Sequence, residues 1–297
     1  MHETKKANRD VLPFDIFKKM FRGDTGTFEV YLHHEHRIHA SKTVFDTEIQ
    51  ILFQLGFILI INWQLPAVTT PVIMPLKLLC LHGWGTNTKI LQSQLNGLMT
   101  DLRRDNTVTF HFLEGDVDSI PGPGISGFYD GPYYSYYKFP RSISDNDTEG
   151  ESLLSAYDRL YDAVEEEGPF DGVLGFSHGG TLAAGFLIHR AKLYSQELPL
   201  FRCAIFINSL PPFRMDPGGD PVVDPDLEGY INVPTVSIGG AEDPLLEYSL
   251  ALYRLCNPSM STWVVHSKGH NIPADTKNVS SIAAAIRKLA IQALAIW

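Results

Sequence analysis

The sequence predicts an α/β domain with a mainly parallel sheet and helices on both of its faces. Short apolar runs alternate with segments of helical periodicity from residue 76 to residue 296. The runs are apolar at consecutive positions, as in strands buried on both faces, instead of alternating with polar residues. A length of 297 residues, with 44% hydrophobic and 20% charged residues, is enough for one large domain of this class and an appendage.

The first elements can be placed in order along the chain. "LKLLCLHG" (76–83) is a buried strand, and the amphipathic segment 87–102 is a helix opened by Asn87, a favoured N-cap residue. The strand 107–115 follows. The segment 115–150 is rich in Gly, Pro, Tyr and Asp, and we expect a long loop there.

The second half repeats the alternation. Thr148 and Glu151 have the spacing of a capping box, and the apolar face of the helix they open is Leu153, Leu154, Tyr157, Leu160, Tyr161 and Val164. We expect the remaining elements to be strand 171–175, helix 178–194, strand 203–209, loop 211–229, strand 233–240, helix 244–255, strand 261–266 and helix 276–296. A ligand crevice then lies beyond the carboxyl ends of the strands.

The character of the chain changes near residue 74. We expect residues 1–73 to be an N-terminal extension of uncertain structure, and residues 74–297 to form the main domain. The apolar segment 49–62 is shorter than the roughly 20 residues of a membrane span. It is also interrupted by Gln50, Gln54 and Asn62. We therefore expect no membrane association, with a tethered protein as the alternative.

Charge and cysteine content narrow the function classes. The net charge is −10, and residues 1–73 are neutral, so the acidic excess lies in the main domain. An acidic domain without a basic stripe is not expected to bind nucleic acid or anionic membranes. The cysteines are widely spaced and fit no zinc or CxxC pattern, which indicates a reducing compartment, the cytoplasm.

The motif Gly175-Phe176-Ser177-His178-Gly179 lies between a predicted strand and a predicted helix. This is the setting of a nucleophile elbow, in which a strained serine between glycines presents its hydroxyl at the edge of the sheet. An ordinary strand-to-helix turn is the alternative. We expect Ser177 to be a nucleophile.

A serine hydroxyl needs a base, and the base needs an acid that orients it. Both follow in the expected chain order: Asp243 comes after strand 233–240, and His270 lies in the loop after strand 261–266. Other acids and another base are present nearby, namely Glu242, Glu247 and His266. His270 is favoured over the alternative histidine, which ends its strand and would stay close to the sheet.

Acyl transfer also requires backbone donors for an oxyanion. We expect one to be the N–H of His178, and the other to be the N–H of Trp84 in "LHGWGTN" (81–87). The indole of Trp84 would also line an acyl pocket. Without their context, His82 and Gly83 would read as an ordinary tight turn.

Two further motifs do not lead to a cofactor or metal site. "GPGISG" (122–127) matches GxGxxG, but no strand precedes it and no helix follows. "HHEHRIH" (33–39) lacks the spacing of a metalloprotease motif, because Ile38 stands where a histidine is needed. We expect no cofactor and no metal.

Seven aromatic residues gather in one loop: Phe128, Tyr129, Tyr133, Tyr134, Tyr136, Tyr137 and Phe139. They form either a flap packed on the domain or an apolar wall for an acyl chain. Tyr133 and Tyr136 are the candidate substrate-binding residues under the second interpretation.

Residues 74–297 resemble the FSH family of small serine hydrolases in "MPLKLLCLHGWGTN", "GPG…DGPYYSYY", "GFSHGG", "GGAEDP" and "GHNIP". The resemblance implies a compact α/β-hydrolase with Ser177, Asp243 and His270 as its triad. "DGPYYSYY" is most similar to fungal members that act beside polyketide synthases on acyl thioesters and esters. "MPLKLLCLHG" resembles a family start, so Met74 is a candidate initiator.

The expected function is hydrolysis of an acyl thioester or ester, with release of a polyketide acyl chain in fungal secondary metabolism. The carrier protein of a polyketide synthase is the expected macromolecular partner. A general short-chain carboxylesterase and a non-catalytic binding protein are the alternatives.

Overall fold

The computed structural model describes residues 28–32, 36–40, 59–62, 75–139, 148–215, 221–223 and 225–296. The chain forms two compact units, residues 1–72 and 73–297. In the first unit, β1 (Phe28–Leu32), β2 (His36–Ala40) and β3 (Leu59–Asn62) form an antiparallel sheet in the order β2-β1-β3. β3 is the end of the apolar segment 49–62, and the rest of that segment lies outside the described residues, as do His33, His34 and Glu35 of the histidine-rich motif.

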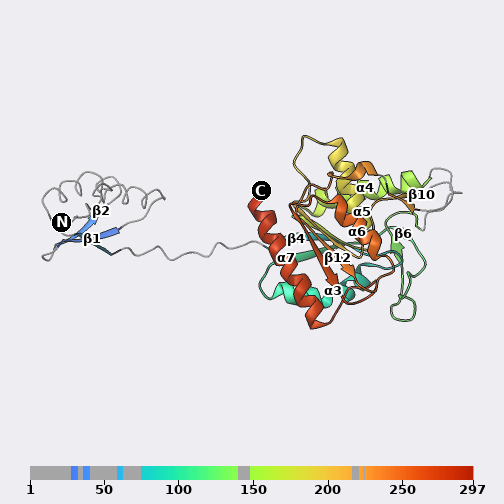
Figure 1. The fold of residues 1–297 in the computed structure, drawn as a ribbon, viewed down its shortest axis with the longest axis horizontal. Helices are drawn as coiled ribbons and strands as arrows, with labels where there is room; N and C mark the ends of the chain where they lie inside the picture. The colour runs from blue at the N-terminus through green and yellow to red at the C-terminus, as the bar shows by residue number, and fades with distance from the viewer. Residues whose placement is uncertain are drawn as a thin grey trace, which may run out of the picture. The chain divides into compact units, whose positions relative to one another are not determined.

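The second unit is built on a parallel six-stranded sheet in the order β13-β12-β9-β8-β4-β5 (Figure 1). Its strands are β4 (Leu76–Leu81), β5 (Val108–Leu113), β8 (Gly172–Phe176), β9 (Cys203–Ile207), β12 (Thr235–Gly240) and β13 (Ser261–His266). The predicted α/β class is confirmed. Because β5 and β8 lie on opposite sides of β4, the strand order reverses between β4 and β8, which is where a crevice opens in such sheets.

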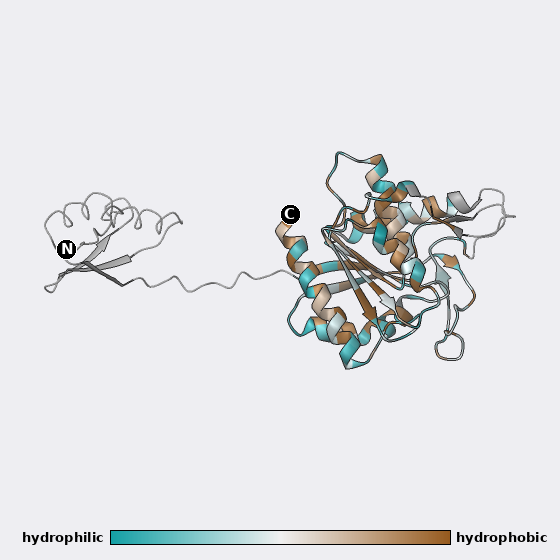
Figure 2. Ribbon diagram, in the orientation of Figure 1, coloured by the Kyte–Doolittle hydropathy of each residue, from teal (hydrophilic) through white to brown (hydrophobic). Residues whose placement is uncertain are grey.

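Helices cover both faces of this sheet. α3 (Thr88–Arg103) and α7 (Thr276–Ile296) pack together on one face. The other face carries α4 (Thr148–Glu167), α5 (His178–Leu193) and α6 (Leu246–Leu255), as Figure 1 shows. The strands are hydrophobic along most of their length (Figure 2). Alternate residues of β4, β8 and β9 enter the two separate cores.

α7 is long and apolar enough to span a membrane by length and composition, with a mean hydropathy of 1.5 over its most apolar window, and it is the one such helix in the described part of the chain. Its inner face packs in the core against α3 and the sheet through Ile282, Ala283, Ile286 and Leu289. This packing in the core explains why the inner face of α7 is apolar.

The loop that we expected over 115–150 contains a short hairpin, β6 (Val117–Asp118) and β7 (Tyr134–Ser135). The expected loop 211–229 likewise contains β10 (Arg214–Met215), β11 (Pro221–Val222) and a 3₁₀ turn at Pro225–Leu227. Leu154 was predicted to face the core from α4, but its side chain is half exposed. Leu153 beside it takes the inward position, because consecutive helical residues point about 100° apart. The side chain of Thr148 lies outside the described residues.

Candidate active site

Ser177 stands between β8 and α5 in a strained backbone conformation, with φ 53° and ψ −119°. Neighbouring glycines make this turn sterically feasible. A Cβ on Gly175 would collide with the backbone of Gly180, and one on Gly179 would collide with the carbonyl of Leu81. The side chain of Ser177 does not cap α5, so its hydroxyl is available for other contacts.

Two hydrogen bonds connect Ser177, His270 and Asp243. Nε2 of His270 lies 2.9 Å from Oγ of Ser177, and Nδ1 of His270 lies 2.8 Å from Oδ2 of Asp243. The Asp243 carboxylate is fully buried, and its other oxygen accepts the N–H of Leu245 at 2.8 Å. The three side chains that the sequence analysis selected therefore meet at the carboxyl edge of the sheet.

The other acids and base that the sequence left open lie elsewhere. Glu242 and Glu247 are exposed. His266 is buried, with 1% of its surface exposed, and its Nε2 lies 3.1 Å from Oδ1 of Asn208. His266 thus faces the sheet interior, as expected for a residue at the end of β13.

The loop after β4 carries Trp84, and its backbone is held by side chains of the same loop. The carbonyl of Gly83, the residue before Trp84, accepts two hydrogen bonds: one from the Thr86 hydroxyl at 2.6 Å and one from Nδ1 of His82 at 2.8 Å. In a trans peptide the C=O and the following N–H point in opposite directions. Holding the Gly83 carbonyl therefore also fixes the direction of the Trp84 N–H.

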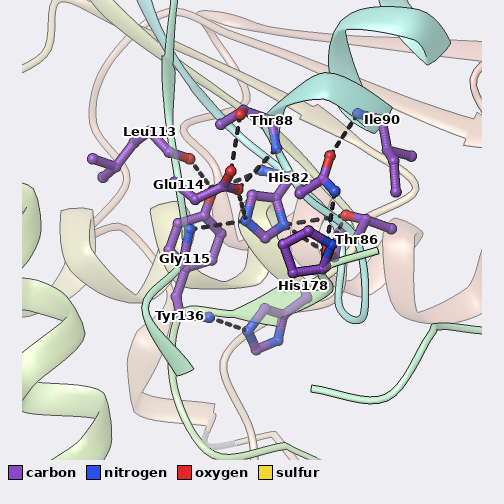
Figure 3. Close-up of polar contacts among 12 residues, drawn as sticks. His82, Thr86, Thr88, Ile90, Leu113, Glu114, Gly115, Tyr136 and His178 are labelled. Carbon is purple, nitrogen blue, oxygen red and sulfur yellow. Dashed lines mark hydrogen bonds and ion pairs between the residues drawn. The ribbon is translucent and has the colours of Figure 1, made fainter. Parts of the chain in front are cut away.

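His82 is the centre of a buried network that the sequence analysis did not anticipate (Figure 3). Its Nε2 accepts the N–H of Gly115 at 2.9 Å, so the ring proton is on Nδ1, facing Gly83. Glu114 accepts the N–H and hydroxyl of Thr88 and lies 3.3 Å from the ring. Burial raises the pKa of Glu114, but the neighbouring His82 ring and the two hydrogen bonds from Thr88 outweigh burial and hold this pKa below the usual value. The network joins the loops after β4 and β5.

Tyr136 belongs to the same network rather than to an open surface. Its ring is 1% exposed, and its hydroxyl donates to Leu113 O and accepts the His82 N–H, both at 2.8 Å. Burial raises the pKa of this phenol well above its usual value, so it stays protonated. The Tyr133 hydroxyl donates to Tyr129 O within its own loop at 2.8 Å. Of the two candidate substrate-binding tyrosines, Tyr136 lies in the interior and Tyr133 is half buried.

Other aromatic rings of this loop cover the residue that follows Ser177. The rings of Tyr137 and Phe139 lie 4.2 and 5.2 Å from that of His178, measured between centroids. Trp84 packs edge-on against Phe139 at 5.4 Å. Aromatic rings from two loops therefore form an apolar wall around His178, the residue after Ser177.

Cys80, Cys203 and Cys256 are buried free thiols, and burial raises the pKa of each, which disfavours the thiolate. Among the residues whose side chains are described, no three His, Cys, Asp or Glu side chains gather as a metal site would require. A cavity of about 430 Å³ lies at the C-terminal end of α5, some 13 residues from Ser177 or about 20 Å along the helix.

The chain is similar to several known proteins. The sequence model of the family described as Serine hydrolase (FSH1) matches residues 72–282. Hydrolase phiM of Talaromyces stipitatus is 42% identical, over 77% of this chain and 92% of that protein. Esterase FPY3 of Fusarium mangiferae is 33% identical, over 74% of this chain and 99% of that protein. Esterase FUS5 of Gibberella moniliformis is also 33% identical, over 70% and 84%. The chain therefore belongs to the FSH1 serine hydrolase family, and its fold is that of an α/β-hydrolase.

Proposed function

We propose that this serine hydrolase cleaves acyl thioesters and esters with Ser177 as nucleophile, His270 as general base and Asp243 as the acid that orients the base. The pair of hydrogen bonds that connects the three side chains carries the proposal. The buried Asp243 carboxylate accepts the Nδ1 proton of His270, which leaves the Nε2 lone pair facing the Ser177 hydroxyl.

The chemistry then proceeds in two balanced steps. Oγ of Ser177 attacks the acyl carbonyl as its proton passes to Nε2 of His270, and the imidazolium returns this proton to the leaving alcohol or thiol. Water then attacks the acyl-serine and gives its proton to the same nitrogen. The carboxylic acid leaves, and Ser177 regains its hydroxyl proton. The imidazolium that forms in each step is stabilised by the carboxylate of Asp243.

The oxyanion of each tetrahedral intermediate is bound by the N–H groups of His178 and Trp84. The first lies at the positive end of α5. The second is held in direction through the Gly83 carbonyl by His82 and Thr86. Donors that are fixed before the reaction stabilise developing charge without reorganising during it.

The substrate that we propose is a hydrophobic, polyketide-like acyl chain on a carrier protein or on a small thiol. The partly exposed rings of Trp84 and Phe139, which pack on each other and reach the His178 ring next to Ser177, support an apolar acyl group. The names of the relatives phiM, FPY3 and FUS5 as hydrolase and esterases support an ester or thioester. The domain is acidic, so the acyl chain rather than long-range charge would provide recognition of an acidic carrier.

We also propose that residues 74–297 are the catalytic domain, that residues 1–73 are an extension of it, and that the protein works in the cytoplasm. The division of the chain into compact units at residues 72 and 73 supports the first part. Three buried thiols without a disulfide among the described residues support a reducing compartment.

The test is kcat/KM for acyl thioesters and p-nitrophenyl esters of two to ten carbons. Each methylene that is buried against the wall should add about 0.8 kcal/mol, or about fourfold in kcat/KM. Ser177→Ala should lower kcat at least about a thousandfold for every substrate. Phe139→Ala should flatten the length dependence, whereas Tyr230→Ala, which removes an aromatic ring at the far end of α5, should leave it unchanged.

If kcat/KM of the wild-type enzyme does not rise with acyl-chain length, and Phe139→Ala does not change this, the protein is a general short-chain carboxylesterase instead. Full activity in Ser177→Ala would contradict the proposed function itself.

A further inference from the structure

The loop that carries His270 is held by a buried amide from another strand. His270 is the central residue of a γ-turn, which is closed by a 2.8 Å hydrogen bond from the N–H of Asn271 to the carbonyl of Gly269. The Asn208 amide nitrogen donates to these same two residues, at 3.2 Å to Gly269 O and at 3.4 Å to Asn271 O. Both carbonyls that flank His270 are thus tied to one side chain.

Asn208 itself is fixed at the end of β9. It is fully buried, and its φ of 45° lies in the left-handed region, which asparagine tolerates better than most residues. Its backbone N–H donates to Ile238 O at 2.8 Å. A rigid backbone therefore aims this amide at the His270 loop.

His266 completes the arrangement on the other side of the amide. Its Nδ1 accepts the N–H of Lys268 at 3.3 Å, so its proton is on Nε2 and donates to Oδ1 of Asn208 at 3.1 Å. Carbonyl oxygens only accept, so the Asn208 nitrogen must face the loop and its oxygen must face His266. Every hydrogen-bonding group of the Asn208 side chain is then used.

The residue before Asn208 holds the nucleophile. The carbonyl of Ile207 accepts the N–H of Ser177 at 2.9 Å. Two consecutive residues at the end of β9 therefore contact both partners of the proposed Ser177–His270 pair, one through its backbone and the other through its side chain.

We propose that Asn208 is a positioning residue that sets the distance between His270 and Ser177, with His266 fixing the orientation of its amide. This inference rests on the proposed function, because the position of His270, and therefore Asn208, affects the rate only if His270 is the general base. Small displacements of a base from its nucleophile cost large factors in rate.

The direct test is Asn208→Asp. Aspartate keeps the shape, the tolerance of left-handed backbone and the acceptor for His266, but it replaces two donated hydrogen bonds by repulsion between oxygens. We expect kcat for a p-nitrophenyl ester to fall about 10- to 100-fold with KM changed less than about twofold. Asn257→Asp is the matched control: Asn257 donates to Asn232 at an exposed site, and kcat should be unchanged.

A second pair of variants keeps the test decisive if Asn208→Asp does not fold. His266→Gln retains an N–H that can reach Oδ1 of Asn208 and should keep kcat within about threefold, whereas His266→Leu should lower kcat about tenfold with unchanged KM. Wild-type kcat in folded Asn208→Asp, or equal kcat in the two His266 variants, would overturn the inference. Ser177→Ala measured beside them separates the two claims, since activity in that variant would contradict the proposed function instead.

Discussion

At the scale of single residues, buried histidines beside the site play different roles from the histidine that contacts Ser177. His270 is partly exposed and bonded to Asp243, whereas His266 is buried in the sheet edge. Burial lowers the pKa of His266, and it is the largest effect. The charges of Asp243 and Asp275 raise this pKa, and the charge of His270 lowers it. The net shift keeps His266 neutral in the folded protein.

A dependence of stability on pH follows from this shift. The pKa of His266 is near 6.5 in the unfolded chain and lower in the folded protein, so the unfolded chain binds the proton first as pH falls. The contribution of neutral His266 to the free energy of unfolding is fully present above about pH 6.5. It is lost as the pH falls toward the pKa of His266 in the folded protein. His266→Gln should therefore lose less stability than the wild type between pH 7 and pH 5, as measured by urea unfolding. Equal losses of stability in the wild type and in His266→Gln would contradict this prediction.

The sequence indicated the residues of the site unequally well. Ser177, Asp243 and His270 could be selected because their order along the chain and their places after strands are properties of sequence. Asn208 could not, because its contact with the His270 loop depends on β9 lying beside β12. Tyr136 was placed in a substrate pocket from its aromatic neighbourhood, but composition does not tell which rings of a loop turn inward.

At the scale of elements, the loop after β4 is preorganised by side chains of its own. The Thr86 hydroxyl donates to the Gly83 carbonyl, and the Asn87 side chain accepts the N–H of Ile90 to cap α3. A capped helix start and an anchored carbonyl together fix the peptide that we propose as an oxyanion donor.

Thr86→Val should lower kcat about tenfold or more with little change in KM, because the Gly83 carbonyl loses one of its two donors and the Trp84 N–H is held less firmly in direction. Thr86→Ser keeps the hydroxyl and should retain most of the activity. The measurement is steady-state hydrolysis of a p-nitrophenyl ester by both variants. Equal activity in the two would show that the hydroxyl does not orient the peptide.

Strands and helices were predicted to within a few residues, since buried strands and amphipathic helices have distinct periods. β4, α3 and α7 are clear cases. The short hairpin strands β6 and β7 were not anticipated, because two-residue strands have no period to detect. Their pairing is instead set by tertiary contacts, such as the bridge between Thr86 and Tyr134.

At the scale of the whole molecule, the site is assembled from the ends of β4, β8, β9, β12 and β13, all within the unit 73–297. A chain that begins at Met74 should therefore fold and hydrolyse esters with kcat/KM within about threefold of the full chain. Thermal unfolding and ester hydrolysis of the two chains give the comparison. Loss of folding in the shorter chain would show that residues 1–73 are needed by the domain.

The proposed catalysis depends on Ser177 being an activated nucleophile. The most direct measurement is labelling by a fluorophosphonate, followed by mass spectrometry of the intact protein and of its peptides. We expect one adduct per chain, located on Ser177, absent in Ser177→Ala and formed far more slowly in His270→Ala. Ser155→Ala, which removes an exposed hydroxyl on α4, should be labelled at the wild-type rate. An adduct on another residue, or labelling of Ser177→Ala at the wild-type rate, would contradict the account.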